Sequence, residues 1–177
     1  MGKTNLIYGG KDKYENIKNR GEYDNTVIVY ASDHGDMLGD HGKWGKGTWR
    51  DPAVRIPLIV RNPFSSYGGL RSNALVSLHD LTATFLDFAG CSQLDDMDSI
   101  SLLPLLDGKC TEHREVLISE FRDWSLAFDG RYKLVLDSKK ENLLFDLKTD
   151  PLEDHNIASK HPDIITKLSK SAYSDKS

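Results

Sequence analysis

An acidic residue and a histidine stand side by side at the end of one apolar segment of the chain. Residues 26–31 read TVIVYA and are followed directly by Ser32-Asp33-His34-Gly35. A β-branched apolar run of this kind indicates a buried strand, and ligands of open α/β sheets bind beyond the carboxyl ends of the strands. Carboxylate and imidazole groups are both common metal ligands. The sequence therefore predicts that Asp33 and His34 contribute to a metal site. The alternative is a purely structural role for the two residues, in a turn or a cap after the strand.

A glycine-rich, basic segment follows the two candidate ligands. Its basic groups are His41, Lys43, Lys46 and Arg50, and its glycines are at positions 35, 39, 42, 45 and 47. Glycine lets the backbone approach a ligand closely, and a lysine ammonium supplies a point positive charge to an oxyanion. A metal ion and a lysine at the end of a strand would suit a sulfate or phosphate ester, because both stabilise developing negative charge. The alternative is a solvated surface loop with scattered charge.

Local patterns indicate the elements that position these residues. Residues 26–31 and 54–60 are predicted to be buried strands of a parallel sheet flanked by helices, with Pro57 at an edge or a bulge. Helices are predicted over residues 12–20 and 79–89, and Gly21 and Gly90 follow them as helix-ending residues. A short apolar segment over residues 102–106 precedes Asp107-Gly108.

The pattern changes after about residue 110. Four short strand-like runs follow, at residues 115–121, 124–128, 131–136 and 143–147. Asp129-Gly130 predicts a hairpin between the second and third runs, and residues 162–170 predict a last helix that begins at Pro162. We therefore expect two domains: residues 1–110 in an α/β domain, and residues 111–177 in a small α+β subdomain with a four-stranded antiparallel sheet.

Composition excludes several classes of protein. The chain has 177 residues, with 23 Lys and Arg against 27 Asp and Glu, so its formal net charge is −4. A general nucleic-acid binder would usually be basic. No segment approaches the roughly 18 consecutive apolar residues that a membrane span needs. The two cysteines, Cys91 and Cys110, form neither a disulfide framework nor a zinc-site pattern.

Several blocks of the sequence resemble one family. The segment DNTVIVYASDHGDMLGDHGKWGKGTWRDPAVRIPLIVRNP, residues 24–63, is similar to a signature region of the sulfatases of the alkaline phosphatase superfamily. Further similar blocks are VSLHDLTATFLDFAG at 76–90, LLPLLDG at 102–108, RYKLV at 131–135, and LFDLKTDP at 144–151 followed by Glu153 and Asn156. The resemblance covers roughly residues 14–170. It implies part of an alkaline-phosphatase-like sheet flanked by helices, followed by the small C-terminal subdomain.

The resemblance also implies roles for individual residues. Asp33 and His34 match a pair of metal ligands, and the metal in this family is usually calcium. Lys46 matches a lysine that contacts the sulfate oxygens, while His41 and Lys43 are expected to lie adjacent to the site. Many members of the family carry Asn where this chain has His34. Because imidazole suits softer ions than calcium, manganese or another transition metal is an alternative.

The nucleophile of the family has no counterpart in this chain. Sulfatases of this kind use a formylglycine made from a Cys or Ser in a C/S-x-P/A-x-R motif, and they complete the metal site with two aspartates. We expect these groups to lie in an N-terminal half outside the 177 residues. The stretch from Cys110 to Arg114 has the right spacing, but Glu112 stands where Pro or Ala is needed.

Other polar residues have structural interpretations. Asp80 is expected at the start of a helix, next to His79. The histidines expected at the surface are His113, His155 and His161. Glu153-Asp154 is expected to be a solvated pair.

The first functional hypothesis is part of a metal-dependent sulfatase that hydrolyses a small-molecule or sugar sulfate ester. The second is a phosphodiester or phosphonate monoester hydrolase of the same superfamily. The third is a catalytically inert truncated fragment or an interaction module. We expect the 177 residues alone to be inactive and to associate as homo-oligomers through an exposed sheet edge. The compartment stays open between periplasmic or extracellular and cytoplasmic, since a targeting signal would lie upstream.

Overall fold

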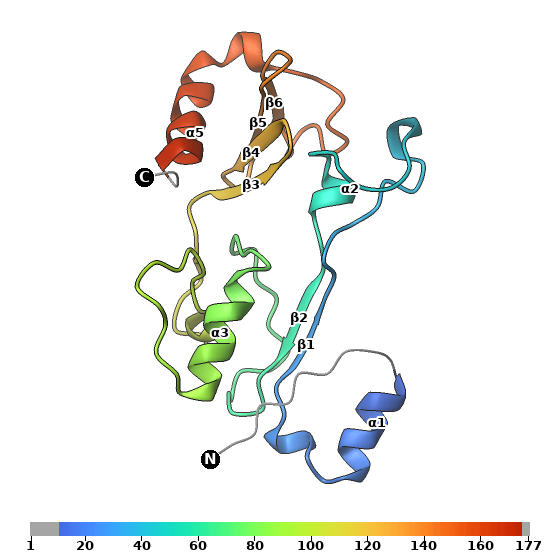
Figure 1. Cartoon of the computed structure of the whole chain (residues 1–177), viewed down its shortest axis with the longest axis vertical. Coiled ribbons are helices and arrows are strands. Elements are labelled where there is room, and N and C mark those ends of the chain that lie inside the picture. The colour runs from blue at the N-terminus through green and yellow to red at the C-terminus, as the bar shows by residue number, and fades with distance from the viewer. Residues whose placement is uncertain (1–10, 175–177) are drawn as a thin grey trace. The chain divides into compact units, whose positions relative to one another are not determined.

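The computed structural model describes residues 11–174, and its elements fall into two compact units (Figure 1). One unit joins the chain up to Asp33 with Pro57–His113, and the other joins His34–Ile56 with Arg114–Ser177. One boundary between the units lies between His113 and Arg114. Residues 34–56, however, belong with the C-terminal part of the chain, although the sequence places them inside the first domain.

The first unit begins with a short helix and a two-stranded ribbon. Helix α1 spans Lys11–Asn19 and is followed by Gly21, whose φ of 69° suits the left-handed turn after a helix, and by the 3-10 helix η1, Tyr23–Asn25. Strands β1, Ile28–Ala31, and β2, Leu58–Arg61, pair in antiparallel fashion, with Ile28 opposite Arg61.

The antiparallel pairing of β1 and β2 corrects the prediction of a parallel sheet covered on both faces. Tyr30 and Ile59 lie opposite each other and are 62% and 64% exposed, so the ribbon is only partly covered within the described chain. The predicted strand over 54–60 is also shorter, because the helical turn α2 occupies Asp51–Val54 and Pro57 directly precedes β2. Parallel strands are usually joined through a crossover helix. Here the connection between β1 and β2, residues 32–57, contains only the 3-10 helix η2, Asp40–Gly42, and the single-turn helix α2, so no crossover helix joins the two strands.

A buried aspartate organises the rest of the first unit. Asp80 starts helix α3, Asp80–Ala89, which ends at Gly90 as predicted. The Asp80 carboxylate accepts the backbone N–H groups of Ser77 and Ile100 at 2.8 and 2.9 Å and lies 3.1 Å from Nε2 of His113. The side chain of His113 is only 4% exposed, so its predicted surface position is wrong. Helix α4 spans Leu103–Leu106.

The second unit contains the predicted four-stranded antiparallel sheet. Its strands follow chain order: β3, Leu117–Phe121; β4, Trp124–Phe128; β5, Tyr132–Asp137; and β6, Leu143–Asp146. Asp129 closes the predicted β4–β5 hairpin, since its carboxylate accepts the N–H groups of Arg131 and Tyr132. The chain then forms the 3-10 helix η3, Ala158–Lys160, and helix α5, Pro162–Ser174. No described helix has both the length and the apolar character for a membrane span.

The two faces of this sheet are covered by different parts of the chain. Leu134 and Leu144 on one face pack against Leu168 and Ala172 of α5. On the other face, Leu126, Val135 and Phe145 pack with partly buried side chains that include Trp49 and Val54. Successive side chains of a strand point to opposite faces, so alternate residues of β5 serve the two layers. The segment 34–56 is therefore the second cover of the sheet, which explains why it belongs to this unit.

Candidate functional site

His34 and Lys46, two of the predicted site residues, meet in the structure. Nζ of Lys46 contacts Nε2 of His34, and Nδ1 of the same ring lies 2.6 Å from the carbonyl oxygen of Gly35. A lysine ammonium and a carbonyl oxygen have opposite roles, because the first only donates and the second only accepts. Nδ1 therefore carries the proton, and Nε2 presents its lone pair toward Lys46. This is the tautomer that a metal ligand needs, with its other nitrogen held by a carbonyl.

Gly35 fixes the backbone next to His34. Its N–H donates to the carbonyl oxygen of Ala53 at 2.8 Å, which ties the beginning of the basic segment to α2. A Cβ at position 35 would lie 1.9 Å from the carbonyl oxygen of Pro52. The close approach of two backbone segments at this point therefore requires glycine.

Internal hydrogen bonds stabilise the rest of the basic segment. The carboxylate of Asp36 accepts the N–H groups of Leu38 and Gly45 at 2.9 and 3.1 Å, and the N–H of Met37 donates to the carbonyl oxygen of Gly45 at 2.9 Å. Met37 is 1% exposed and anchors the segment. Gly45 has a φ of 77°, which only glycine adopts without strain. We call residues 35–47, between His34 and the residues that lead into α2, the Lys46 loop.

The other predicted site residues have different surroundings. Nε2 of His41 lies 2.8 Å from Nη1 of Arg50, and its Nδ1 lies 3.6 Å from the carboxylate of Asp154. Lys43 is exposed, and its carbonyl oxygen accepts the N–H of Gly39 at 2.9 Å. Asp33 is exposed and ends the first segment of the first unit, so one boundary between the units falls between the two predicted metal ligands.

The described residues supply only part of a metal coordination shell. Residues 11–174 contain no group of three or more His, Cys, Asp or Glu side chains placed to hold a metal ion. The lone pair on Nε2 of His34 fits such a role, and the carboxylate of Asp33 is of a suitable type. Further ligands would have to come from outside this set. Both cysteines are free, and Cys91 is exposed.

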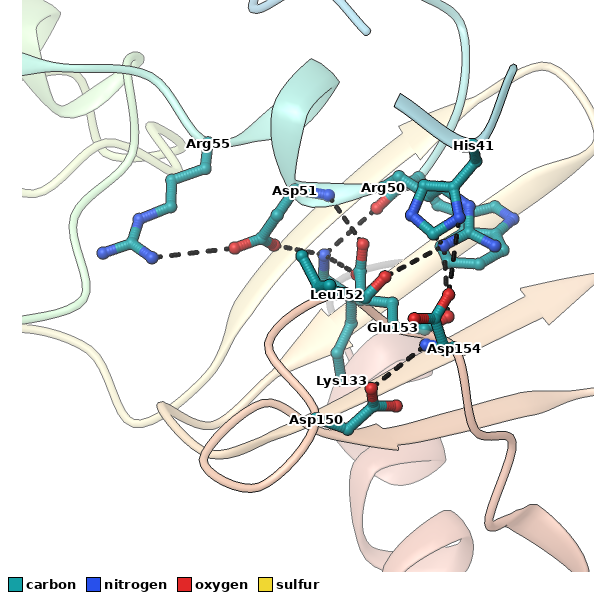
Figure 2. A network of polar contacts seen from close by, with 10 residues as sticks. His41, Arg50, Asp51, Arg55, Lys133, Asp150, Leu152, Glu153 and Asp154 are labelled. Atoms are coloured by element: carbon teal, nitrogen blue, oxygen red, sulfur yellow. Dashed lines mark hydrogen bonds and ion pairs between the residues drawn. The ribbon is translucent and has the colours of Figure 1, made fainter. Parts of the chain in front are cut away.

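A buried ion cluster contacts residues 49–51, which follow the Lys46 loop, and it was not predicted from the sequence. Nζ of Lys133 contacts the carboxylate of Asp51, lies 2.5 Å from Oε1 of Glu153, and donates to the carbonyl oxygen of Trp49 at 3.2 Å (Figure 2). The side chains of Lys133 and Glu153 are 2% and 1% exposed, so the expected solvated position of Glu153 is wrong. The signal in the sequence was a lysine inside the apolar run 132–136, where strand alternation points it toward one covered face.

A tight turn presents Glu153 to this cluster. The Asp150 carboxylate accepts the N–H groups of Asp154 and His155 at 3.1 and 2.8 Å. Burial opposes ionisation of Asp150, but these backbone donors together with the His155 side chain outweigh it and lower the pKa of the carboxyl group. Glu153 has a φ of 59°, in the left-handed region, and Arg50 donates to the carbonyl oxygens of Leu152 and Glu153 at 3.2 and 3.1 Å. The turn therefore fixes Arg50 as well as Lys133.

Comparison with known proteins identifies relatives of most of the chain. The profile of the family described as N-sulphoglucosamine sulphohydrolase, C-terminal, matches residues 39–175. Choline-sulfatase from Rhizobium meliloti is 33% identical over 162 residues, covering 86% of this chain and 31% of the relative. N-acetylglucosamine-6-O-sulfatase from Bacteroides thetaiotaomicron is 34% identical over 154 residues, covering 79% of this chain and 28% of the relative.

Solved structures share the fold. The structure of BT4656 in complex with its substrate D-glucosamine-2-N,6-O-disulfate superposes with a TM-score of 0.83 at 28% identity, covering 92% of this chain and 36% of that one. Phosphonate monoester hydrolase of Agrobacterium radiobacter gives a TM-score of 0.83 at 27% identity, covering 93% and 38%. The chain thus spans about a third of the length of the relatives that it matches.

Proposed function

This chain belongs to the sulfatases of the alkaline phosphatase superfamily and corresponds to their C-terminal portion, and from that premise we propose that it forms part of a metal-dependent enzyme that hydrolyses sulfate esters. The observation that supports the proposal is the contact between Nζ of Lys46 and Nε2 of His34. It joins a cation suited to an oxyanion with a nitrogen whose lone pair suits a metal ion.

Lys46 is proposed to bind the sulfate group. Its side chain is exposed, and its ammonium would donate hydrogen bonds to sulfate oxygens as negative charge develops on them. In the structure the ammonium donates to His34 instead, so an anionic ligand would replace that acceptor. A flexible lysine at the end of a braced loop can make this exchange without moving the backbone.

Asp33 and His34 are proposed to hold a divalent metal ion, calcium or, given the imidazole ligand, manganese or another transition metal. When bound, such an ion polarises the ester oxygens and adds positive charge at the site. The hydrogen bond from Nδ1 of His34 to the carbonyl oxygen of Gly35 orients the ring for this role. The nucleophile, a formylglycine by family resemblance, is proposed to come from an N-terminal half of the enzyme.

The substrate class that we favour is a sugar sulfate. One structural neighbour is described in complex with a disulfated glucosamine, and one relative is an N-acetylglucosamine-6-O-sulfatase. A second candidate activity is phosphonate monoester hydrolysis. The similarity to the Agrobacterium radiobacter enzyme, as high in TM-score as that of the sugar sulfatase neighbour, favours it specifically.

The test is turnover of aryl sulfate and aryl phosphonate by the full-length enzyme and by its Lys46→Ala variant. Loss of one oxyanion donor typically lowers kcat by about 10²- to 10³-fold. We expect a loss of that order for the preferred ester, and preference for the sulfate would select the first activity. Lys140→Ala, which removes an exposed lysine in the β5–β6 turn, is the control and should keep its turnover. Equal turnover of the Lys46→Ala and Lys140→Ala variants would reject the role of Lys46.

A further inference from the structure

The conformation of the Lys46 loop depends on α2, because both of its ends join that helical turn. At the first end, the N–H of Gly35 donates to the carbonyl oxygen of Ala53 at 2.8 Å. After the second end, the chain runs through Trp49 and Arg50 directly into Asp51, the first residue of α2. Both ends of the Lys46 loop are thus attached to α2, while His41 and Gly47 also contact Asp154 and Trp124.

The ion cluster holds α2 through several directed contacts. Lys133 uses its three ammonium donors on the Asp51 carboxylate, the Glu153 carboxylate and the Trp49 carbonyl oxygen. The second carboxylate oxygen of Glu153 accepts the N–H of Asp51 at 2.9 Å. Figure 2 shows the side chains of Lys133 and Glu153 meeting at Asp51. Residues 49–51 are therefore held from two segments far away in the sequence.

Aromatic packing adds to this attachment. Trp49 stacks on Phe145 of β6 with ring centroids 5.2 Å apart, and the guanidinium carbon of Arg50 lies 4.7 Å from the centre of the Trp49 ring. Stacking alone leaves freedom to slide, whereas ion pairs and hydrogen bonds have direction. Buried ion pairs are poor stabilisers compared with apolar side chains of similar volume, because desolvation offsets their attraction. A cluster as buried as this one is better explained by the geometry it imposes.

We propose that Lys133, Glu153 and Asp51 are positioning residues that hold the Lys46 loop in the conformation in which Lys46 meets His34. The cluster acts through α2: it fixes residues 49–51, and α2 in turn fixes Gly35 and the segment that follows. The catalytic consequence rests on the role proposed for Lys46, but the ordering of the loop is a property of this chain and can be measured without any activity.

The first test is amide hydrogen exchange of the Glu153→Gln variant. This substitution keeps the shape of the side chain and removes the charge that Lys133 contacts. Leaving a buried partner imperfectly satisfied is expected to speed exchange at Met37, Gly39 and Gly45 by about 10- to 100-fold, because local opening governs these rates. Exchange at Leu134 and Leu144, on the face of the sheet that α5 covers, should rise much less.

The matched control is Asp146→Asn. It removes another ion pair of the same sheet, since Asp146 accepts three hydrogen bonds from Arg131, but it touches no residue of the Lys46 loop in the described contacts. Loop exchange in this variant should stay at the level of the unaltered chain. If Glu153→Gln and Asp146→Asn change loop exchange equally, the cluster is merely stabilising and the proposal fails. Should Glu153→Gln not fold, Asp51→Asn, at a carboxylate 21% exposed, provides the same comparison.

The second test measures kcat and KM in the full-length enzyme. A displacement of about 1 Å at a binding group can cost about 100-fold in rate, so Glu153→Gln should lower kcat/KM by about 10- to 100-fold at a temperature where it is fully folded. Lys133→Arg, which keeps the positive charge of the cluster, should lose less kcat/KM than Glu153→Gln. Full activity together with a loosened loop would overturn the catalytic part of the proposal. If Lys46→Ala is fully active while Glu153→Gln loosens the loop, the role of Lys46 fails and the positioning by the cluster stands.

Discussion

Replacing Gly35 by alanine should damage the second unit although its φ is not in the left-handed region. The added Cβ would lie 1.9 Å from the carbonyl oxygen of Pro52 and 3.3 Å from the carbonyl carbon of Ala53. Both contacts are with backbone, which cannot turn away as a side chain can. α2 would have to shift away from the Lys46 loop, and that shift would also break the hydrogen bond from the Gly35 N–H to the Ala53 carbonyl oxygen.

The magnitude follows from these two consequences. Overpacking typically costs about 1–3 kcal/mol. Leaving a buried hydrogen-bonding group without its partner costs about 1–3 kcal/mol more. We therefore expect Gly35→Ala to lower the free energy of unfolding by about 2–6 kcal/mol, a large part of the stability of an ordinary domain.

Substitutions at two other glycines serve as controls for the steric cost at Gly35. One measures the cost of a positive φ alone, and the other measures the effect of alanine on the unfolded chain. Gly42 has a φ of 66° and open space around the added Cβ, so Gly42→Ala should cost only about 1–2 kcal/mol of backbone strain. Gly68 has neither a positive φ nor a neighbour within 4 Å. Gly68→Ala should therefore raise the free energy of unfolding by about 0.4–1 kcal/mol, through the unfolded chain.

The assay is urea unfolding followed by far-UV circular dichroism, which reports on both units, and by tryptophan fluorescence, which reports on the packing of the second unit because Trp49 stacks on Phe145. A second measurement is the rate at which Lys46 is acylated, which should rise when the loop is released from α2. If Gly35→Ala unfolds within about 0.5 kcal/mol of the unaltered chain and the acylation rate does not change, the close approach at Pro52 does not hold the loop.

Three further predictions concern the rest of the chain. Hydrogen bonds from Arg131 lower the pKa of Asp146, so this pair stabilises the fold fully above the ordinary carboxyl pKa of about 3.9 and stops doing so as the pH falls through the lowered value. Asp146→Asn should thus weaken the fold near pH 7 and remove part of its acid sensitivity, as urea unfolding at pH 7 and pH 3 would show. Leu134→Ala, at a fully buried side chain, should cost about 2–5 kcal/mol in the same assay. The 177 residues alone should show no sulfate-ester turnover and should associate, and robust turnover or a monomeric mass in sedimentation at every concentration would contradict these two expectations.

Local sequence signals predicted most elements of the second unit. Asp129-Gly130 and Pro162 each determine structure through their own backbone preferences, and the hairpin and the start of α5 lie where these residues indicate. The two apolar runs at 26–31 and 54–60 were harder, because apolar character indicates a strand but carries no information on its direction. Their antiparallel pairing depends on the path of the chain between them.

Contacts between residues far apart in the sequence could not be predicted from local patterns. Lys133 lies 82 positions from Asp51 and 20 from Glu153, so neither partner is visible in a local window. His113 is likewise in contact with a residue 33 positions away, Asp80. The family resemblance placed His34 and Lys46 in one site with different roles, but their direct contact across 12 positions was not predicted. The sequence thus offered a hypothesis for the residues around Lys46, but it did not indicate the ion cluster of Lys133, Asp51 and Glu153.

The participation of residues 34–56 in the second unit limits how this part of the chain can be exchanged between relatives. The chain passes from one unit to the other near residues 33, 56 and 113, so the second unit is not a continuous cassette. Recombination that transferred only residues 114–177 would leave Phe145 and Val135 facing a foreign cover in place of Trp49 and Val54. The sheet and the segment carrying His34 and Lys46 should therefore be inherited together.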